Sequence, residues 1–299
     1  MSAVAKTSPG STDTRETPTT PSLSVLMALY YKERPAHLRE CLDSLCWQTL
    51  QANEIVIVKD GPLTDELESV LHEFETRLPL KVLALSTNQG TGVAVRLGLE
   101  QCTGELVARA DSDDIYAPTR FQKQVQWLVD NSGISIVSAA GAEFEADYRR
   151  PFCIRRAPVG GRELQRFARY RNPITYQQAT IFRRADALAA GNYQDSLLFE
   201  DYDLWARMML RGCEIYNMPE VLAFIRCGNG MINRRRGWKY VRCELSFLGK
   251  MRRIGFLSPA QYVANVVMRV PLRLLPAGTL GRFYRVFLRK PAETSEAAG

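Results

Sequence analysis

Short apolar runs alternate with segments of helical periodicity from Leu23 onward. The runs are apolar at consecutive positions, which is typical of strands buried on both faces. The segments between them repeat apolar residues every three or four positions, as at Leu38, Leu42 and Leu45, and so predict amphipathic helices. The expected strands are 24–30, 54–58, 80–85, 106–110 and 134–139, and the expected helices are 35–49, 65–78, 91–101, 118–131 and 199–210. This alternation predicts an α/β fold with a mostly parallel central sheet and helices on both faces.

The pattern also divides the chain. Residues 1–22 consist mainly of Ser, Thr, Pro, Ala and Gly, so we expect a disordered N-terminal segment. Residues 23–226 form the expected catalytic domain, residues 227–290 a basic, amphipathic helical C-terminal appendage, and residues 291–299 a disordered tail.

Composition narrows the class of protein. With 299 residues and 46% hydrophobic content, the chain can bury a large core. Its seven cysteines are scattered and its histidines number two, which favours reduced thiols in a cytoplasmic protein over a disulfide framework or a zinc site. The net charge of +7 suits an anionic partner. No run approaches the roughly 20 apolar residues that span a bilayer.

Acidic residues follow two of the predicted strands. Asp60 comes after the second strand, and Asp111-Ser112-Asp113-Asp114 comes after the fourth. Ligands of open α/β sheets bind beyond the carboxyl ends of the strands, where both groups would project. A plain turn at Asp60 and a helix cap at the 111–114 cluster are the alternatives. Hard carboxylate oxygens favour Mg²⁺ or Mn²⁺, commonly shared with substrate phosphates.

A second acidic cluster, Phe199-Glu200-Asp201-Tyr202-Asp203-Leu204-Trp205, opens the last predicted helix of the domain. Acidic residues in a first helical turn are the ordinary response to the helix dipole. A carboxylate at a helix start that faces the crevice is also what transfer of a group to a hydroxyl requires. Residues 88–92 lack the third glycine of a dinucleotide fingerprint, and we expect a loop whose following helix presents its N-terminus to phosphate.

Taken in order, these motifs resemble those of the family 2 glycosyltransferases of the GT-A fold. The resemblance rests on residues 24–27, Ser44 to Thr49, Glu54 to Gly61, Asn88 with Gly90, Gly104 to Asp114 and Phe199 to Trp205, and it covers about 23–226. Residues 59–64, 170–173 and 237–240 further resemble the exopolysaccharide-building, amylovoran-type branch.

The resemblance implies roles for individual residues. Asp201 would be the catalytic base, Asp60 would bind the nucleotide base, and Asp113 and Asp111 would hold the metal, Mn²⁺ or Mg²⁺, with Asp111 also near the donor ribose. Asn88 and Arg96 would add donor contacts, although Ala94-Val95-Arg96 stands where the family often carries Ala-Arg-Asn. The acceptor region would include Glu200, Asp203 and Trp205.

The implied reaction is an inverting, metal-dependent transfer from a nucleotide sugar, most simply a UDP-hexose, to a hydroxyl of a lipid-linked or polysaccharide acceptor. Two other functions stay open on charge and fold alone. The first is a basic module that binds nucleic acid or another anionic surface, although no nucleic-acid motif accompanies the charge. The second is a nucleotidyltransferase, although residues 30–35 lack the glycines of a triphosphate loop.

The C-terminal region bears on location. Arginines and lysines from Arg234 to Lys290 are interleaved with aromatic and aliphatic residues. Such a segment either lies on an anionic membrane or packs on the catalytic domain with its cations solvated. We therefore expect a cytoplasmic protein, with a peripheral position on the inner face of the cytoplasmic membrane as the consequence of the first alternative.

Overall fold

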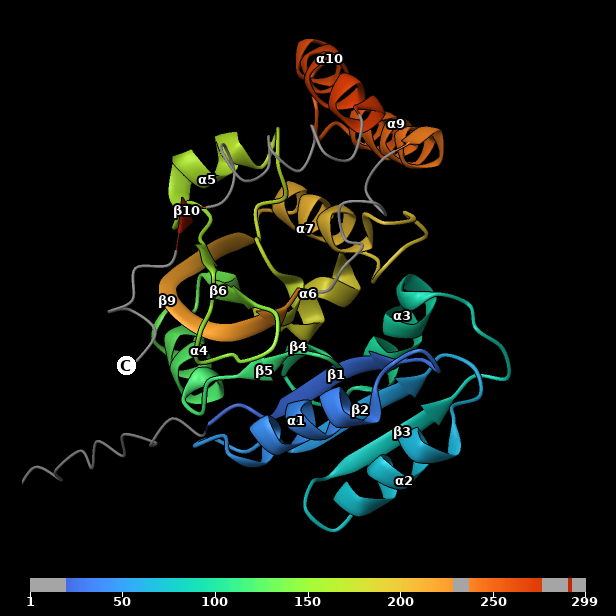
Figure 1. Ribbon diagram of the computed structural model, residues 1–299. Helices are drawn as coiled ribbons and strands as arrows, with labels where there is room; N and C mark the ends of the chain where they lie inside the picture. The colour runs from blue at the N-terminus through green and yellow to red at the C-terminus, as the bar shows by residue number, and fades with distance from the viewer. Residues whose placement is uncertain (1–19, 228–236, 276–289, 292–299) are drawn as a thin grey trace, which may run out of the picture.

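The computed structural model describes residues 20–227, 237–275 and 290–291. Across these residues a single curled sheet is flanked by helices (Figure 1). The strands are β1 (Leu23–Leu29), β2 (Glu54–Lys59), β3 (Leu80–Ala84), β4 (Leu106–Asp111), β5 (Ile115–Tyr116), β6 (Ile134–Phe144), β7 (Cys153–Arg155), β8 (Ile181–Arg183), β9 (Glu214–Arg226) and β10 (Lys290–Pro291). The helices are α1 (Pro35–Cys46), α2 (Asp65–Phe74), α3 (Thr91–Gln101), α4 (Arg120–Asp130), α5 (Gly161–Phe167), η1 (Gln177–Ala179), α6 (Arg184–Ala189), α7 (Glu200–Leu210), α9 (Gly237–Arg253) and α10 (Pro259–Leu274).

The sheet is mixed: β1 to β4 pair only in parallel with one another, and β6 pairs in parallel with β9. Its strand order is β10-β7-β6-β8-β4-β1-β2-β3. Strand β1 pairs in parallel with β2 and β4, and β2 pairs in parallel with β3. The short β8 lies antiparallel between β4 and β6. The long β9 runs parallel to β6 along its length, and its residues Ala223 and Phe224 also pair antiparallel with β5. The predicted mostly parallel α/β sheet is confirmed, and the antiparallel β8 is an addition that the apolar pattern did not show.

Alternate residues of each central strand face opposite layers, as the pleat of a strand requires. Val25 and Met27 of β1 join the apolar cluster that contains α1, α2 and α4. Leu26 joins the cluster on the other face, where α3 and α7 pack. Burial on both faces explains why the strands read as unbroken apolar runs.

Helices α9 and α10 form a hairpin that packs on α7, and Figure 1 shows α7 between this hairpin and the central strands. The ring of Phe247 in α9 stacks on Phe199 with centroids 4.6 Å apart, and it also contacts Tyr202. Lys250 of α9 forms an ion pair with Asp203 of α7 at 3.0 Å. The inner face of the C-terminal region is therefore packed on the catalytic domain, as one of the two alternatives predicted.

The chain ends are only partly described by the structure. Residues 1–19 and 292–299, which make up most of the two segments expected to be disordered (1–22 and 291–299), lie outside the described residues. So do 228–236 and 276–289 of the expected C-terminal appendage. Lys290 and Pro291 form the short strand β10 against β7, where the end of a helical region and the first residue of a tail were expected. No helix among the described residues has the length and apolarity that crossing a membrane demands.

Candidate active site at the carboxyl edge of the sheet

The carboxyl ends of β2 and β4 deliver the two predicted acidic sites to the same edge of the sheet. Strand β1 pairs with both strands in the same direction, with Leu29 opposite Lys59 and Ala28 opposite Asp111. The first turns of α3 and α7 also meet, because a Cβ atom built on Gly92 would lie 3.6 Å from Cβ of Glu200. Both helix starts are therefore neighbours, as the topology rule for α/β sheets predicts for a binding crevice.

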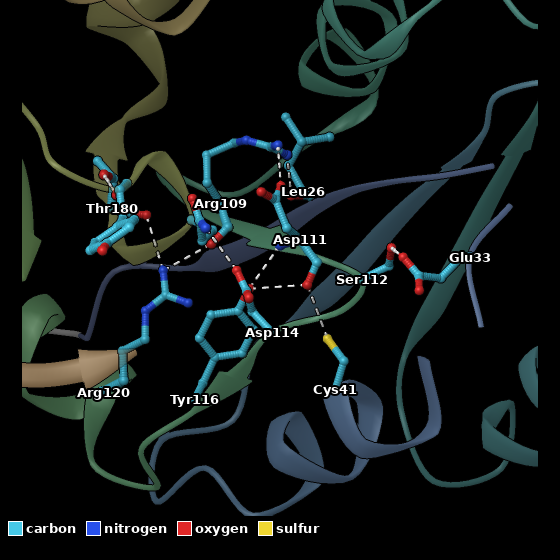
Figure 2. A network of polar contacts seen from close by, with 12 residues as sticks. Leu26, Glu33, Cys41, Arg109, Asp111, Ser112, Asp114, Tyr116, Arg120 and Thr180 are labelled. Carbon is cyan, nitrogen blue, oxygen red and sulfur yellow. Dashed lines mark hydrogen bonds and ion pairs between the residues drawn. The ribbon is translucent and has the colours of Figure 1, made fainter. Parts of the chain in front are cut away.

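The side chain of Asp111 is held by a buried arginine, Arg109. Arg109 has no exposed surface, and its Nη2 lies 3.2 Å from Oδ1 of Asp111 while its Nη1 donates to the carbonyl oxygen of Leu26 at 2.6 Å (Figure 2). Burial raises the pKa of Asp111, and the charge of Arg109 opposes that rise. The side chain of Asp111 is 31% exposed, so part of it stays open to solvent.

The backbone of Asp111 is fixed as well. Its N–H donates to the hydroxyl oxygen of Tyr116 at 2.8 Å, and that hydroxyl donates back to the Asp111 carbonyl at 3.2 Å. The thiol of Cys41 in α1 lies 3.4 Å from the same carbonyl oxygen (Figure 2). A carboxylate whose backbone and side chain are both held is preorganised for a ligand.

Asp113 and Asp114 diverge after the strand. Both carboxylate oxygens of Asp114 are engaged by the protein, one accepting from the backbone N–H of Arg226 at 2.8 Å and one from the amide of Gln178 at 2.7 Å. Asp113 is only partly buried, and burial followed by the charges of Asp111 and Glu33 raises its pKa to about 7. Asp114 therefore ties the loop to β9 and η1, while Asp113 remains with Asp111 as a candidate metal ligand.

Glu33 is a third carboxylate at this edge. It follows β1, and its Oε2 accepts from the hydroxyl of Ser112 at 2.9 Å (Figure 2). No group of three or more His, Cys, Asp or Glu side chains in the described part of the chain is arranged to hold a metal. The residues nevertheless fit a divalent cation, because burial and then the charges of Asp111 and Glu33 raise the pKa of Asp113, and a cation would offset both effects.

Asp60 holds the loop that leads into α3. Its Oδ1 accepts from the backbone N–H of Gln89 at 2.7 Å, and its Oδ2 accepts from that of Gly90 at 2.9 Å. The carbonyl of Asp60 accepts from the side chain of Asn88 at 3.2 Å. Only 3% of Asp60 is exposed. The contact of this carboxylate with a nucleotide base stays a prediction, beside a loop-holding role that the hydrogen bonds establish.

Gly61 explains why this loop can lie so close to the strand end. Its φ of +87° lies in the left-handed region, and a Cβ atom there would come within 2.8 Å of the backbone nitrogen of Asn88. A side chain would therefore push the loop away from Asp60.

The start of α7 carries the predicted base. Asp201 is partly exposed, and its Oδ2 accepts from the side-chain amide of Asn172 at 2.8 Å. The oxygen of the Asn172 side chain accepts from the backbone N–H of Ile174 at 3.1 Å, which fixes the orientation of the amide. Burial, followed by the charge of Asp201, raises the pKa of Glu200 to about 7, with the charge of Asp111 also contributing. The acidic residues of β4 and α7 therefore act on one another electrostatically.

Two predicted acceptor residues are corrected. Asp203 and Trp205 have no exposed surface, so neither can contact an acceptor. Asp203 pairs with Arg207 and Lys250, and Trp205 packs edge-on against Phe182 with centroids 5.6 Å apart. Helix α7 is covered by the sheet on one side and by the hairpin on the other, so only its first turn reaches the crevice.

The remaining predicted donor residues lie on or next to α3. Asn88 is exposed in the loop that Asp60 holds, and Arg96 is exposed on α3 one turn after Gly92. The sequence reasoning missed Glu33, Arg109 and Asn172. The rule that ligands bind beyond strand ends would have found Glu33, and a charged residue inside the apolar run 106–110 was the signal for Arg109.

Comparison with known proteins agrees with this geometry. Residues 24–188 match the model of the family described as glycosyl transferase family 2. The amylovoran biosynthesis glycosyltransferase AmsE of Erwinia amylovora is 38% identical over 87% of this chain and 97% of its own length. The UDP-Gal:alpha-D-GlcNAc-diphosphoundecaprenol beta-1,3-galactosyltransferase of Escherichia coli is 33% identical over 91% of this chain and 98% of its own length.

Two solved structures share the GT-A fold at low identity. The mannosyltransferase PcManGT from Pyrobaculum calidifontis, in complex with GDP-Man and Mn²⁺, matches with a TM-score of 0.63 at 18% identity, covering 90% of this chain and 76% of that one. TarS 1–349 of S. aureus in complex with UDP-GlcNAc matches with a TM-score of 0.60 at 18% identity, covering 77% and 66%.

Proposed function

Because the chain belongs to glycosyltransferase family 2, we propose that it transfers a hexose, with inversion, from a UDP-sugar to a hydroxyl of a lipid-linked or polysaccharide acceptor. The donor and acceptor classes are supported by the related galactosyltransferase, whose name gives UDP-Gal and a diphosphoundecaprenol-linked sugar. The amylovoran enzyme supports a product in surface or exported polysaccharide. Family membership sets aside the nucleic-acid module and the nucleotidyltransferase.

Asp201 is the proposed catalytic base. The acceptor hydroxyl oxygen attacks the anomeric carbon of the donor while the bond from that carbon to the diphosphate oxygen breaks, and the hydroxyl proton passes to Asp201. UDP leaves with the electron pair of the broken bond. A positioned base contributes roughly 10²–10⁴-fold to such a rate. Asn172 supports this role because it fixes one oxygen of the Asp201 carboxylate.

Asp113 and Asp111 are the proposed holders of Mn²⁺ or Mg²⁺. Both cations take oxygen ligands and complete their shell with substrate phosphates, which suits a site with two carboxylates. When bound, the cation supplies positive charge that stabilises the diphosphate leaving group. Arg109 keeps Asp111 in place for it, and Asp60 keeps the Asn88 loop beside the donor.

The observation that carries the proposal is the convergence of two acidic groups from distant parts of the chain. Asp111 ends β4 and Glu200 begins α7, yet the charge of Asp111 contributes to the raised pKa of Glu200. The first turns of α3 and α7 also lie side by side, with a Cβ atom built on Gly92 3.6 Å from Cβ of Glu200. Both observations support a proposed metal-binding pair and a proposed base that would flank one crevice, as displacement at a carbon between a hydroxyl and a diphosphate requires.

Calorimetric titration tests the donor class. UDP, GDP and dTDP are titrated into the protein with Mn²⁺ and with a chelator, beside Asp113→Ala and, as a matched control, the exposed Asp65→Ala of α2. We expect binding of UDP that needs both Mn²⁺ and Asp113 and that Asp65→Ala leaves intact. Binding of none of the three nucleotides would remove the proposal, and tighter binding of GDP would move the donor to GDP-sugars.

The proposed acceptor also bears on location. A lipid-linked sugar lies at the membrane surface, so we propose a cytoplasmic enzyme that works at the inner face of the cytoplasmic membrane. This proposal draws support from the C-terminal region, where four cations of residues 237–275 are exposed and the single acid is buried.

A further inference from the structure

Helix α10 turns one apolar face outward. Val263, Val267 and Leu274 recur every four or seven residues and are 57%, 65% and 45% exposed. The exposed Met268 and Pro271 extend the same face. These five residues, called the α10 stripe below, extend over about three turns of the helix, and none of them is charged. A soluble surface rarely leaves so continuous an apolar strip on one helix without a partner.

The two cations of α10 point away from the stripe. Arg269 contacts Glu244 of α9 at 2.6 Å, and Arg273 contacts it at 2.9 Å. Glu244 has no exposed surface, so both arginines serve to join the two helices. They are only 18% and 12% exposed at the side chain. These two arginines are therefore not solvated as the packed alternative expected, and they leave the outward face of α10 apolar.

The exposed charge of the hairpin is uniformly positive and lies on α9. Lys239, Arg242, Arg252 and Arg253 are exposed, and the single acid of residues 237–275 is the buried Glu244. Trp238 at the start of α9 is 69% exposed. An apolar helix face accompanied by exposed cations and an exposed Trp is the combination that binds an anionic bilayer in its interfacial plane.

We propose that the α10 stripe docks into the surface of an anionic lipid bilayer, with the cations of α9 against the headgroups. The choice of a bilayer rests in part on the proposed function, which places the acceptor on a lipid. The charge pattern supports it separately, because a second copy of this chain would bring like-charged hairpins together. Docking would fix the distance of α7 from the bilayer, because Asp203 of α7 and the preceding Phe199 both contact α9.

Flotation of the full chain tests the docking. The vesicles are phosphatidylcholine alone and phosphatidylcholine mixed with phosphatidylglycerol. We expect the protein to float with the mixed vesicles and Val263→Asp/Val267→Asp to lose about tenfold or more in partitioning, because two charges enter the apolar layer. Val82→Asp on the edge strand β3, where the side chain is 43% exposed, should float as the unchanged protein does.

A fluorescence pair reports where the stripe lies. The protein already holds four tryptophans, including the exposed Trp238, so each variant is compared with the unchanged protein. Val267→Trp should add emission that shifts to the blue and is quenched by brominated lipid, whereas the emission added by Val82→Trp should do neither. Retention of flotation by the double aspartate variant, or equal behaviour of the two Trp variants, would overturn the proposal. So would a dimer in solution that the double variant converts to monomer, since a second copy would then cover the stripe.

The UDP titration on the same variants separates this proposal from the proposed function. The double aspartate variant should keep the UDP affinity of the unchanged protein, because Val263 and Val267 lie on the exposed side of the hairpin. Lost flotation with retained UDP binding confirms docking by the stripe. Retained flotation with normal UDP binding overturns the docking and leaves the glycosyltransferase proposal untouched.

Discussion

The side-chain amide of Asn172 donates to Oδ2 of Asp201 at 2.8 Å. Its orientation is set by the N–H of Ile174, so the donor always faces the carboxylate. Asn172 lies 29 residues before Asp201, in the segment between α5 and η1. If Asp201 is the base, as proposed, Asn172 acts through it as a positioning residue.

Asn172→Ala should lower kcat about ten- to a hundredfold, because a hydrogen bond to a charged group contributes roughly 1.5–3 kcal/mol. KM for the donor should change little. Asn172→Asp places a second negative charge beside Asp201 and should raise the pKa of the base, moving the acid limb of the kcat profile to higher pH. Steady-state kinetics across pH measures both effects. An unchanged kcat in both variants would contradict the role given to Asn172.

Glu200 should make the protein less stable as the pH rises. Its pKa is raised to about 7 by burial and by Asp201, from an ordinary value of 4.5. The folded state therefore binds this proton more tightly than the unfolded state, so the stability it contributes is present below pH 4.5 and is lost as the pH passes through 7. The loss is on the order of 2–3 kcal/mol.

Glu200→Gln removes that loss. Its melting temperature should exceed that of the unchanged protein by about 5 °C at pH 8 and by little at pH 5. Thermal unfolding at the two pH values measures the difference. The exposed Glu145→Gln serves as the control and should show no such pH dependence. A gain for Glu200→Gln that is the same at both pH values would show that the carboxyl does not titrate as stated.

Asp60 should stabilise the loop that leads into α3, and it should affect donor binding only through that loop. Asp60→Ala leaves the N–H groups of Gln89 and Gly90 without their acceptor, which costs about 2–3 kcal/mol of unfolding free energy. Amide hydrogen exchange over residues 86–92 should become faster, and UDP affinity should fall. The exposed Asp65→Ala of α2 provides the comparison. Lost UDP affinity with unchanged exchange at Gln89 and Gly90 would instead favour direct contact with the nucleotide base.

Asp203 should matter for folding and not for the acceptor. Asp203→Ala leaves Arg207 and Lys250 without their buried counter-charge, and we expect a loss of about 3–5 kcal/mol in denaturant unfolding. Lys250→Met should cost less, since Arg207 still neutralises Asp203. UDP affinity should survive wherever the protein is folded. An unfolding free energy equal to that of the unchanged protein would contradict the structural role.

The first half of the fold follows from local patterns. Helix α3 has the predicted bounds, β2 and β4 are each one residue longer than predicted, and β1 begins and ends one residue earlier. Long apolar runs and periodic helices carry their own signal. The second half depends on pairing between distant segments. Strands β5, β7 and β8 have two or three residues each, and β9 pairs with β6 through shifts in register around Pro219. No local pattern specifies such pairings.

The site divides in the same way. Asp60, Asp111 and Asp113 could be placed because strand ends converge by topology. The sequence could not show that Asp201 is partly exposed while Asp203 is buried, since both stand in the same acidic first turn. The hairpin makes this difference, because Lys250 of α9 pairs with Asp203, which lies 47 residues earlier in the chain.

The contact between Phe199 and Phe247 sets a limit on how this enzyme can be divided or recombined. Phe199 directly precedes the acidic turn of α7, so the aromatic stack joins the hairpin to the residue next to Glu200 and Asp201. A chimera that exchanges the hairpin with that of a relative must carry the matching face of α7 with it. An exchange of the C-terminal helices that alters acceptor specificity would thus also shift the position of the proposed base, Asp201. The two properties should therefore change together.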